Sequence, residues 1–305
     1  MSVNFTYEAD ELLTEAIMSS TPIIIVEGSD DVPFYEEIIK SLEREMEVYA
    51  SENLLISEGV SGCNGVKKCL KKINDNADGV DVKKYILGII DKDVGDFRGD
   101  LDTNMEGLFV LKYYSIESHF INKHNVKYLI HQITNASSSL LDSLNLEEAL
   151  FEDIKNDLSD LYYVSLDALK SECDISYSSK YIYSNSIIQI LKDNYEEKLS
   201  EKIAELDEFA STLGISNTFE NLLFIVKGKW MMEFFILKMK TILDNLNTKC
   251  SQQKLCQFCK TDKSDQCSFK LLFHYDIKRA KGMLFKNINI PEISYIKDEI
   301  AKLSA

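Results

Sequence analysis

The sequence predicts an α/β fold, with a parallel sheet and flanking helices in its N-terminal part and a mainly helical C-terminal half. Three observations indicate this fold: short β-branched runs bounded by Gly or Pro, helix-like apolar spacing between those runs, and a change to helical periodicity from about residue 122 onward. Strands that alternate with helices at this spacing imply βαβ crossovers and a sheet covered on both faces. We therefore expect two domains, at residues 1–125 and 126–305.

The first predicted strand covers residues 21–28 and is too short for a helix. Asp31 and Pro33 indicate the start of the helix after it. Further strands are expected at residues 54–57, 84–90 and 108–115, with a basic helix at 66–73. In the C-terminal half, helices are expected at 138–157 and 195–213, with a buried helix at 230–239.

Composition and charge exclude several classes of protein. The 305 residues are 45% hydrophobic, no stretch is apolar enough to cross a bilayer, and the acidic start lacks a signal peptide, so we expect a cytoplasmic globular protein without membrane contact. A net charge of −16 argues against a broadly basic nucleic-acid-binding surface. Charge is nevertheless segregated: residues 227–281 hold twelve Lys and Arg against five acids, and residues 142–208 hold seventeen acids against six lysines. The basic stretch indicates either a phosphate-facing surface or an ordinary solvated face.

Acidic residues follow the predicted strands. Glu27 ends the first strand, Asp91 and Asp93 end the third, and Glu117 follows the fourth. The carboxyl ends of parallel strands share one edge of a sheet, so these acids should converge there. Their mutual repulsion would need a divalent cation such as Mg²⁺ or Mn²⁺. The alternative is that single acids, Asp31 and Glu117 above all, only begin helices.

Three sequence blocks, IIIVEGSDD at 23–31, GIIDKD at 88–93 and YYSIES at 113–118, resemble the signature blocks of the Toprim domain. The pattern Glu27-x3-Asp31, Asp91-x-Asp93, Ser115-x-Glu117 is most similar to Toprim nucleases of the OLD type. Together with VKGK at 226–229, it resembles the stand-alone Toprim effectors of anti-phage systems, such as the effector of the PARIS system. The resemblance covers residues 20–120 well and the helical half only loosely.

This resemblance implies metal-dependent cleavage of nucleic acid, in the effector subfamily cleavage of host tRNA, and restraint by an ABC-type ATPase partner. It implies a set of metal-ligating residues and a late lysine that acts on the phosphate. The ligands are Glu27, Asp31, Asp91, Asp93 and Glu117; the catalytic residues are Glu27, Asp91, Asp93 and Lys229; the nucleic-acid-binding residues are Lys227 and Lys229.

Several alternatives stay open at this point. One is a Toprim-like non-catalytic binding or regulatory subunit of an ATPase-containing complex, and another is a metal-dependent phosphotransferase or primase-like enzyme. The sequence also leaves open DNA or RNA as substrate, one or two catalytic metals, and a monomer or a homodimer.

The cysteines indicate a second metal site. Four of the seven lie within eighteen residues as C-x5-C-x2-C-x7-C, at Cys250, Cys256, Cys259 and Cys267. In a cytosolic chain four such cysteines, with a C-x2-C pair, match the ligands of a structural zinc site, although the loops are unusual and the first pair is five residues apart. The site would be a small zinc knuckle with basic residues around it. The alternative is four reduced, partly buried thiols, and His274 is a candidate substitute ligand.

Overall fold

The computed structural model describes residues 8–99 and 104–304, and the chain divides into two compact units. The first unit comprises Met1–Tyr113 together with Ile288–Ala305, and the second comprises Tyr114–Asn287. This division differs from the expected boundary at residue 125, because the chain enters the second unit earlier and its last segment returns to the first. Arg44 binds that segment by donating hydrogen bonds to the carbonyls of Ala301 at 2.8 Å and Leu303 at 2.6 Å.

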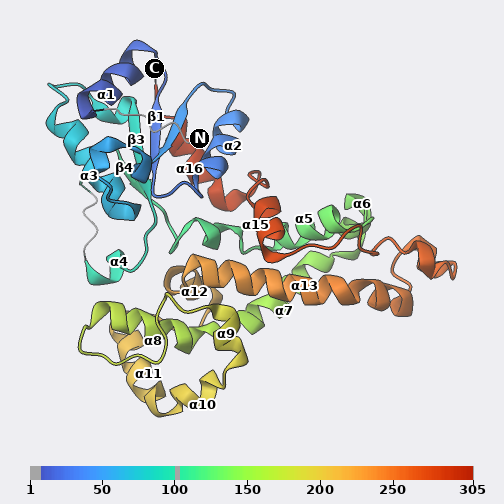
Figure 1. The fold of residues 1–305 in the computed structure, drawn as a ribbon. Helices are drawn as coiled ribbons and strands as arrows, with labels where there is room; N and C mark the ends of the chain where they lie inside the picture. The colour runs from blue at the N-terminus through green and yellow to red at the C-terminus, as the bar shows by residue number, and fades with distance from the viewer. Residues whose placement is uncertain (1–7, 100–103, 305) are drawn as a thin grey trace. The chain divides into compact units, whose positions relative to one another are not determined.

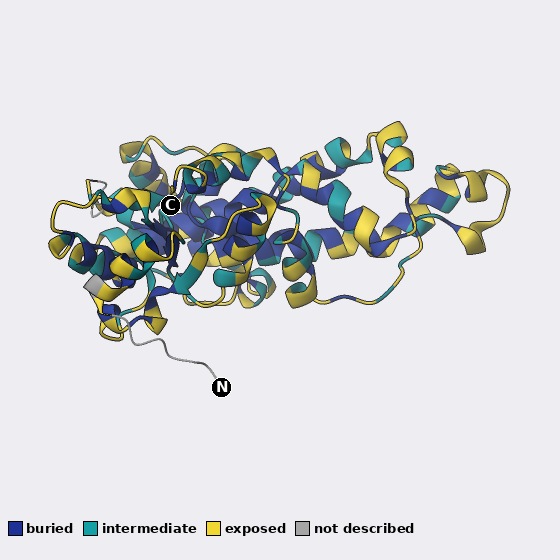
Figure 2. Cartoon of the chain, turned by 90° about the horizontal axis from the view of Figure 1, so that it is seen from above, coloured by how far each residue is buried: buried dark blue, intermediate teal, exposed yellow. Residues whose placement is uncertain are grey.

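The first unit is built on a sheet of four parallel strands in the order β2-β1-β3-β4. The strands are β1 (Ile23–Val26), β2 (Glu47–Ala50), β3 (Ile86–Ile90) and β4 (Leu108–Val110). β1 and β3 are buried along their whole length, as the continuous β-branched runs predict. Figure 2 draws buried residues, those of β1 and β3 among them, in dark blue. The expected α/β class with a parallel sheet is confirmed.

Helices cover both faces of this sheet. On one face Ile25, Leu70 and Ile90 belong to a core shared with α1 and α3, and on the other the ring of Phe109 lies 5.7 Å from that of Tyr295. Figure 1 shows α1 and α3 on one side of the strands and α2 and α16 on the other. The helical elements of this unit are α1 (Ala9–Met18), α2 (Val32–Ser41), η1 (Ser51–Asn53), η2 (Leu55–Ser57), α3 (Gly62–Asp75), η3 (Val82–Lys84), α4 (Gly95–Arg98), η7 (Pro291–Ile293) and α16 (Ser294–Ile300).

The second predicted strand is wrong. Residues 54–57 are apolar because Leu54 and Ile56 are buried under α3, but their backbone forms 3₁₀ turns. The strand is instead β2, an edge strand with only one fully buried residue, Ala50. An edge strand needs apolar residues on one face at most, so its pattern is weak in the sequence.

The second unit is helical among its described residues. Its elements are η4 (Ile116–Phe120), α5 (Lys123–Ile133), α6 (Ser138–Leu144), α7 (Leu146–Leu158), α8 (Leu161–Cys173), α9 (Ile187–Lys192), α10 (Tyr195–Leu199), η5 (Ser200–Lys202), α11 (Ile203–Thr212), α12 (Phe219–Ile225), α13 (Gly228–Gln253), α14 (Gln257–Lys260), η6 (Ser264–Gln266) and α15 (Ile277–Leu284). The expected helix at 138–157 is broken at Asn145, whose φ is 46°, and the one at 195–213 is interrupted by η5.

The longest of these helices is α13, whose apolar stretch from Trp230 to Met239 is largely buried. The expected buried helix is therefore confirmed. Within residues 8–99 and 104–304, no helix has the length and apolarity needed to span a membrane.

Candidate functional site

The order of the strands reverses between β1 and β3. From β1 the chain runs to β2 on one side and then returns to β3 on the other. Such a switch point leaves a crevice outside the carboxyl ends of the two neighbouring strands, where α/β proteins bind ligands. Glu27 directly follows β1 and Asp91 directly follows β3, so both lie at this point.

The side chain of Glu27 links the two strand ends. Its Oε1 accepts a hydrogen bond from the backbone N–H of Asp91 at 2.9 Å. The backbone carbonyl of Glu27 accepts another from the N–H of Gly62, the first residue of α3, at 3.2 Å. Burial raises the pKa of Glu27 to about 8, with the neighbouring Asp93 carboxylate as the next cause, while the hydrogen bond from Asp91 acts in the opposite direction. Without a cation, this carboxyl group is therefore largely protonated at neutral pH.

Asp31 and Asp93 lie near the carboxyl group of Glu27, and the negative charge of each contributes to its raised pKa. Asp93 has a φ of 45°, in the left-handed region that Asp tolerates better than most residues and that costs about 1–3 kcal/mol where it is strained. Asp31 occupies the N-cap position of α2, yet its side chain makes no capping hydrogen bond. Helix capping therefore does not explain Asp31.

The donor chemistry of these residues fits Mg²⁺ or Mn²⁺. Carboxylates offer only oxygen atoms, which these ions prefer. The pKa of Glu27 is raised first by burial and then by the negative charge of Asp93, and a bound cation would compensate that charge. The carboxylates do not form a compact group of ligands, however. In the described part of the chain, the one group of three or more His, Cys, Asp or Glu side chains close enough together to hold an ion consists of cysteines. Mg²⁺ often takes one or two carboxylates and keeps several waters, so it needs no closed cage.

Two tyrosine hydroxyls lie beside these acids in addition to the predicted residues. Tyr35 of α2 is 2% exposed, and its pKa is raised by burial and then by Asp31 and Asp91. The hydroxyl of Tyr295 accepts a hydrogen bond from Lys112 N at 2.8 Å, and burial raises its pKa as well. Tyr35 follows Asp31 by one helical turn, a spacing visible in the sequence. Tyr295 comes from the far end of the chain, where no local pattern indicates it.

Glu117, the fifth expected ligand, lies in the second unit and is 7% exposed. Its Oε1 accepts a hydrogen bond from Lys281 Nζ at 2.9 Å, and its Oε2 accepts one from Ser115 Oγ at 2.7 Å. Burial pushes the pKa of Glu117 up, but the pairing with Lys281 outweighs burial and holds it below the ordinary value. The charge of Glu117 is thus compensated within its own unit, and its role as a metal ligand stays a prediction.

The VKGK segment packs against this same region. A Cβ on Gly228 would lie 1.7 Å from Ser115 Oγ. The start of α13 can therefore lie this close to Ser115 only because residue 228 is a glycine. Lys227 Nζ donates a hydrogen bond to the carbonyl of Tyr183 at 2.9 Å, whereas Lys229 is exposed. Of the two expected phosphate-binding lysines, Lys229 is the one whose side chain lies in solvent.

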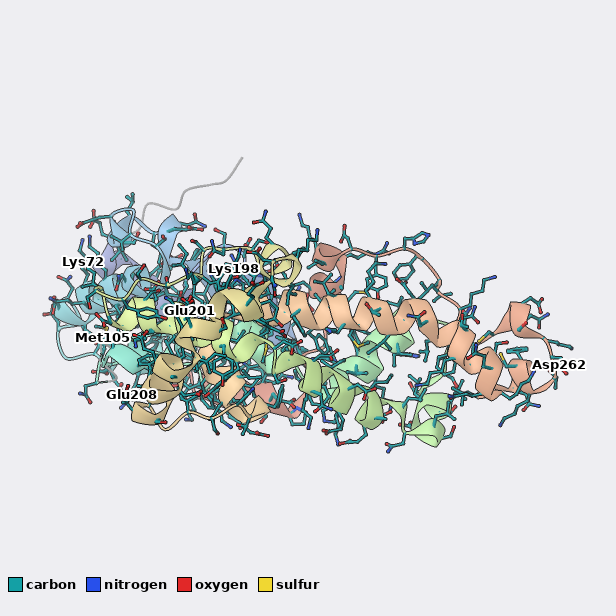
Figure 3. The ribbon with its side chains drawn as sticks, turned by 90° about the horizontal axis from the view of Figure 1, so that it is seen from below. Lys72, Met105, Lys198, Glu201, Glu208 and Asp262 are labelled. Atoms are coloured by element: carbon teal, nitrogen blue, oxygen red, sulfur yellow. The ribbon has the colours of Figure 1, made fainter. Side chains whose placement is uncertain are left out.

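The four clustered cysteines come together at the C-terminal end of α13. They are all buried, and their Sγ atoms lie within 4.8 Å of one another: Cys250, Cys256, Cys259 and Cys267. Asp262, labelled in Figure 3, belongs to the loop between the third and fourth cysteine. The Sγ atoms of Cys250 and Cys259 are 3.7 Å apart, close to the distance of about 3.8 Å that follows for tetrahedral zinc with Zn–S bonds of about 2.3 Å. This group could hold a metal such as zinc, and His274 lies outside it.

Backbone N–H groups support these sulfur atoms. Cys256 N donates to Cys250 Sγ and Phe269 N donates to Cys267 Sγ, both at 3.4 Å. Burial pushes the pKa of Cys256 up, but backbone hydrogen bonds, that of Ser268 foremost, outweigh burial and lower it to about 6. The lowered pKa of Cys256 favours its thiolate, which is the form that binds a metal, whereas burial raises the pKa of Cys250 and of Cys259.

Comparisons with models of known protein families and with curated proteins find no match to this chain. Membership of the Toprim family stays a prediction that rests on the three sequence blocks. To these the structure adds a parallel sheet with Glu27 and Asp91 at adjacent strand ends.

Proposed function

We propose that this protein is a metal-dependent nuclease of the Toprim type that acts as an effector in anti-phage defence. The observation that carries the proposal is the meeting of Glu27 and Asp91 at the switch point of the sheet, joined by a hydrogen bond of 2.9 Å. The resemblance supplies the expectation that this edge holds Mg²⁺ or Mn²⁺. The oxygen-only donors around Glu27 support that expectation.

Each residue of the first unit has a separate task in this proposal. Glu27, Asp91 and Asp93 would hold the cation, and Asp31 would add its charge to theirs. A bound Mg²⁺ or Mn²⁺ supplies Lewis-acid chemistry, because it polarises a phosphodiester and lowers the pKa of water. The backbone N–H of Asp91 orients the Glu27 carboxyl group, which in its ionised form can also accept a proton. In the second unit, exposed Lys229 is available to contact a phosphate.

The substrate and the partner in this proposal come from the resemblance alone. We propose RNA, in particular host tRNA, as the substrate, with DNA as the alternative polymer. We also propose that an ABC-type ATPase restrains the nuclease until infection. The proposed substrate and the proposed partner are both wrong if the protein has no nuclease activity.

A second candidate is a non-catalytic Toprim-like subunit of an ATPase-containing complex. The ion pair of Glu117 with Lys281 favours it, since a carboxylate that is already compensated needs no cation. The two candidates differ in what Glu27 does: a catalytic site requires its carboxyl group, whereas a binding subunit tolerates its loss.

The test is cleavage of total tRNA and of plasmid DNA by the wild type and Glu27→Gln, with Mg²⁺, Mn²⁺ or EDTA. Gln keeps the shape of the side chain and an oxygen for the hydrogen bond from Asp91, but it cannot ionise. Glu36→Gln is the matched control, because it makes the same change at an exposed position on α2.

The nuclease proposal predicts metal-dependent cleavage by the wild type and Glu36→Gln, and none by Glu27→Gln. Intact polymers in every lane, with the wild type folded and metal present, would support the non-catalytic subunit instead. Cleavage that Glu27→Gln retains in full would place the active site elsewhere.

We also propose that the four clustered cysteines bind one structural Zn²⁺. The distance of 3.7 Å between two of the sulfurs and the lowered pKa of Cys256 support this. Elemental analysis of the purified chain should give one zinc per chain, reduced by Cys256→Ser but not by Cys173→Ser, a cysteine outside the group. Equal zinc content in both variants would count against the site.

A further inference from the structure

The second unit has a pocket of about 370 Å³ that none of the roles above uses. Such a volume is at the lower end of the range for small-ligand sites. Its walls come from α8, α10 and α11 and from the residues that join α7 to α8 and α11 to α12. Figure 1 labels these helices. The residues that matter for the argument are Asp160, Tyr163, Tyr195, Glu196, Leu199 and Ile203.

The helices around this pocket are fixed to one another by polar contacts. Tyr163 OH donates a hydrogen bond to Asp207 at 3.1 Å, and Lys170 forms an ion pair with Glu205 at 2.7 Å, so α8 is tied to α11 at two points. Part of the wall is apolar, since Leu199 lines the pocket and is only 1% exposed. The pocket is therefore formed before any ligand binds.

The wall of the pocket is negatively charged and aromatic. Asp160 and Glu196 line it, no Lys, Arg or His does, and within the described part of the chain neither acid has an ion pair or a side-chain hydrogen bond. The ammonium group of Lys238 forms an ion pair with Asp157 at 2.8 Å. The pKa of Asp160 is nevertheless raised, by burial foremost and then by Asp157 and Glu196, although Lys238 acts in the opposite direction. Burial raises the pKa of Tyr195 to about 12, with Asp160 and Glu196 as further causes, so this hydroxyl lies close to both carboxylates.

The surrounding sequence strengthens the negative potential. All the lining residues except Asn217 belong to the stretch 142–208, which holds seventeen acids and six lysines. Clefts lined by charge of one sign raise the local concentration of the opposite charge. An anionic ligand such as a phosphate is therefore disfavoured at this position, whereas a cation can pair with both exposed carboxylates.

We propose that this pocket binds an organic cation, namely the ammonium or guanidinium group of a small amine or of a basic side chain. The two tyrosine rings offer faces to the cation, an interaction worth about 0.5–2 kcal/mol elsewhere. The carboxylates of Asp160 and Glu196 accept its hydrogen bonds, and the alkyl stem lies on Leu199. This inference does not depend on the proposed nuclease activity.

Isothermal titration calorimetry on the full-length chain tests it. Cadaverine and agmatine present the two head groups as free amines, and the acetylated methylamides of lysine and arginine present them as protein side chains. The matching norleucine derivative is the uncharged control. The pocket variants are Asp160→Asn and Tyr195→Ala, and Glu208→Gln on α11, labelled in Figure 3, removes an acid that does not line the pocket.

The expected result is saturable binding of at least one cation with a dissociation constant in the millimolar range or below, weakened at high salt. The norleucine derivative should not bind. Asp160→Asn and Tyr195→Ala should each weaken the affinity about five- to tenfold, while Glu208→Gln should leave it unchanged. A preference for the free amines indicates a small-molecule ligand, and a preference for the amino-acid derivatives indicates a protein side chain.

Absence of binding by every cation at millimolar concentration would overturn the proposal. So would equal affinity in wild type, Asp160→Asn and Tyr195→Ala, provided that circular dichroism shows all three folded. An equal loss in Glu208→Gln would mean that the acidic surface attracts cations without a pocket site, which also overturns it.

Discussion

Replacing Glu27 with Gln should change how the stability of the protein depends on pH. In the folded chain the pKa of Glu27 is raised from 4.5 to about 8, first by burial and then by Asp93. Each pKa unit corresponds to about 1.4 kcal/mol, so ionising Glu27 in the folded, metal-free protein costs up to about 5 kcal/mol. Gln carries no charge at any pH and still accepts the hydrogen bond from Asp91.

The sign of the effect follows from proton binding. Between pH 4.5 and about 8 the folded state keeps the proton on Glu27 and the unfolded state releases it. The stabilisation from this group is therefore complete below pH 4.5 and is lost as the pH rises through the folded pKa. We expect Glu27→Gln to match the wild type in acid and to become progressively more stable than it towards pH 8.

Urea unfolding in chelator-treated buffer over this pH range measures the difference. The gap between Glu27→Gln and wild type should widen by several kcal/mol with rising pH, up to the limit of about 5 kcal/mol. Glu36→Gln, exposed on the same unit, should show no such trend. A gap that stays constant with pH would refute the idea that Glu27 is a buried, uncompensated carboxyl group.

Three further outcomes follow from the second unit. Gly228→Ala should lower stability by about 1–3 kcal/mol through overpacking, and Ser115→Ala in the same chain should recover part of this loss in thermal unfolding, because Ser115 Oγ is the closest clashing atom. Lys281→Met should lower the free energy of unfolding by about 3–5 kcal/mol, because it leaves buried Glu117 without the ammonium group that pairs with it. A loss below about 0.5 kcal/mol in urea unfolding would contradict that pairing. Chelator treatment should lower the melting temperature of wild type but not that of Cys256→Ser, and an equal shift in both would argue against zinc at the cysteines.

The sequence predicts the parts of the fold whose signals are local. The buried runs at Ile23 and Ile86 become β1 and β3, and the periodicity after Trp230 becomes α13, because continuous burial requires apolar residues there. β2 is missed because an edge strand buries little, and the helix break at Asn145 is missed because only its backbone conformation reveals it.

The candidate site is predictable to a similar degree. Strand ends predict that Glu27 and Asp91 come together, since the carboxyl edge of a parallel sheet is shared. The pairing of Glu117 with Lys281 is not predictable, because the two are 164 residues apart and no local pattern connects them. The same holds for Tyr295, which joins the first unit only through the return of the chain end.

The central claim is that the carboxyl edge of the sheet holds a divalent cation through Glu27 and Asp91. Electron paramagnetic resonance of Mn²⁺ titrated into the zinc-loaded chain tests this claim most directly, because free and bound Mn²⁺ are distinguished without any substrate. We expect saturable Mn²⁺ binding by wild type and Glu36→Gln that is strongly weakened in Glu27→Gln and in Asp91→Asn. Mn²⁺ binding of equal strength in all four proteins, or none in the wild type, would contradict it.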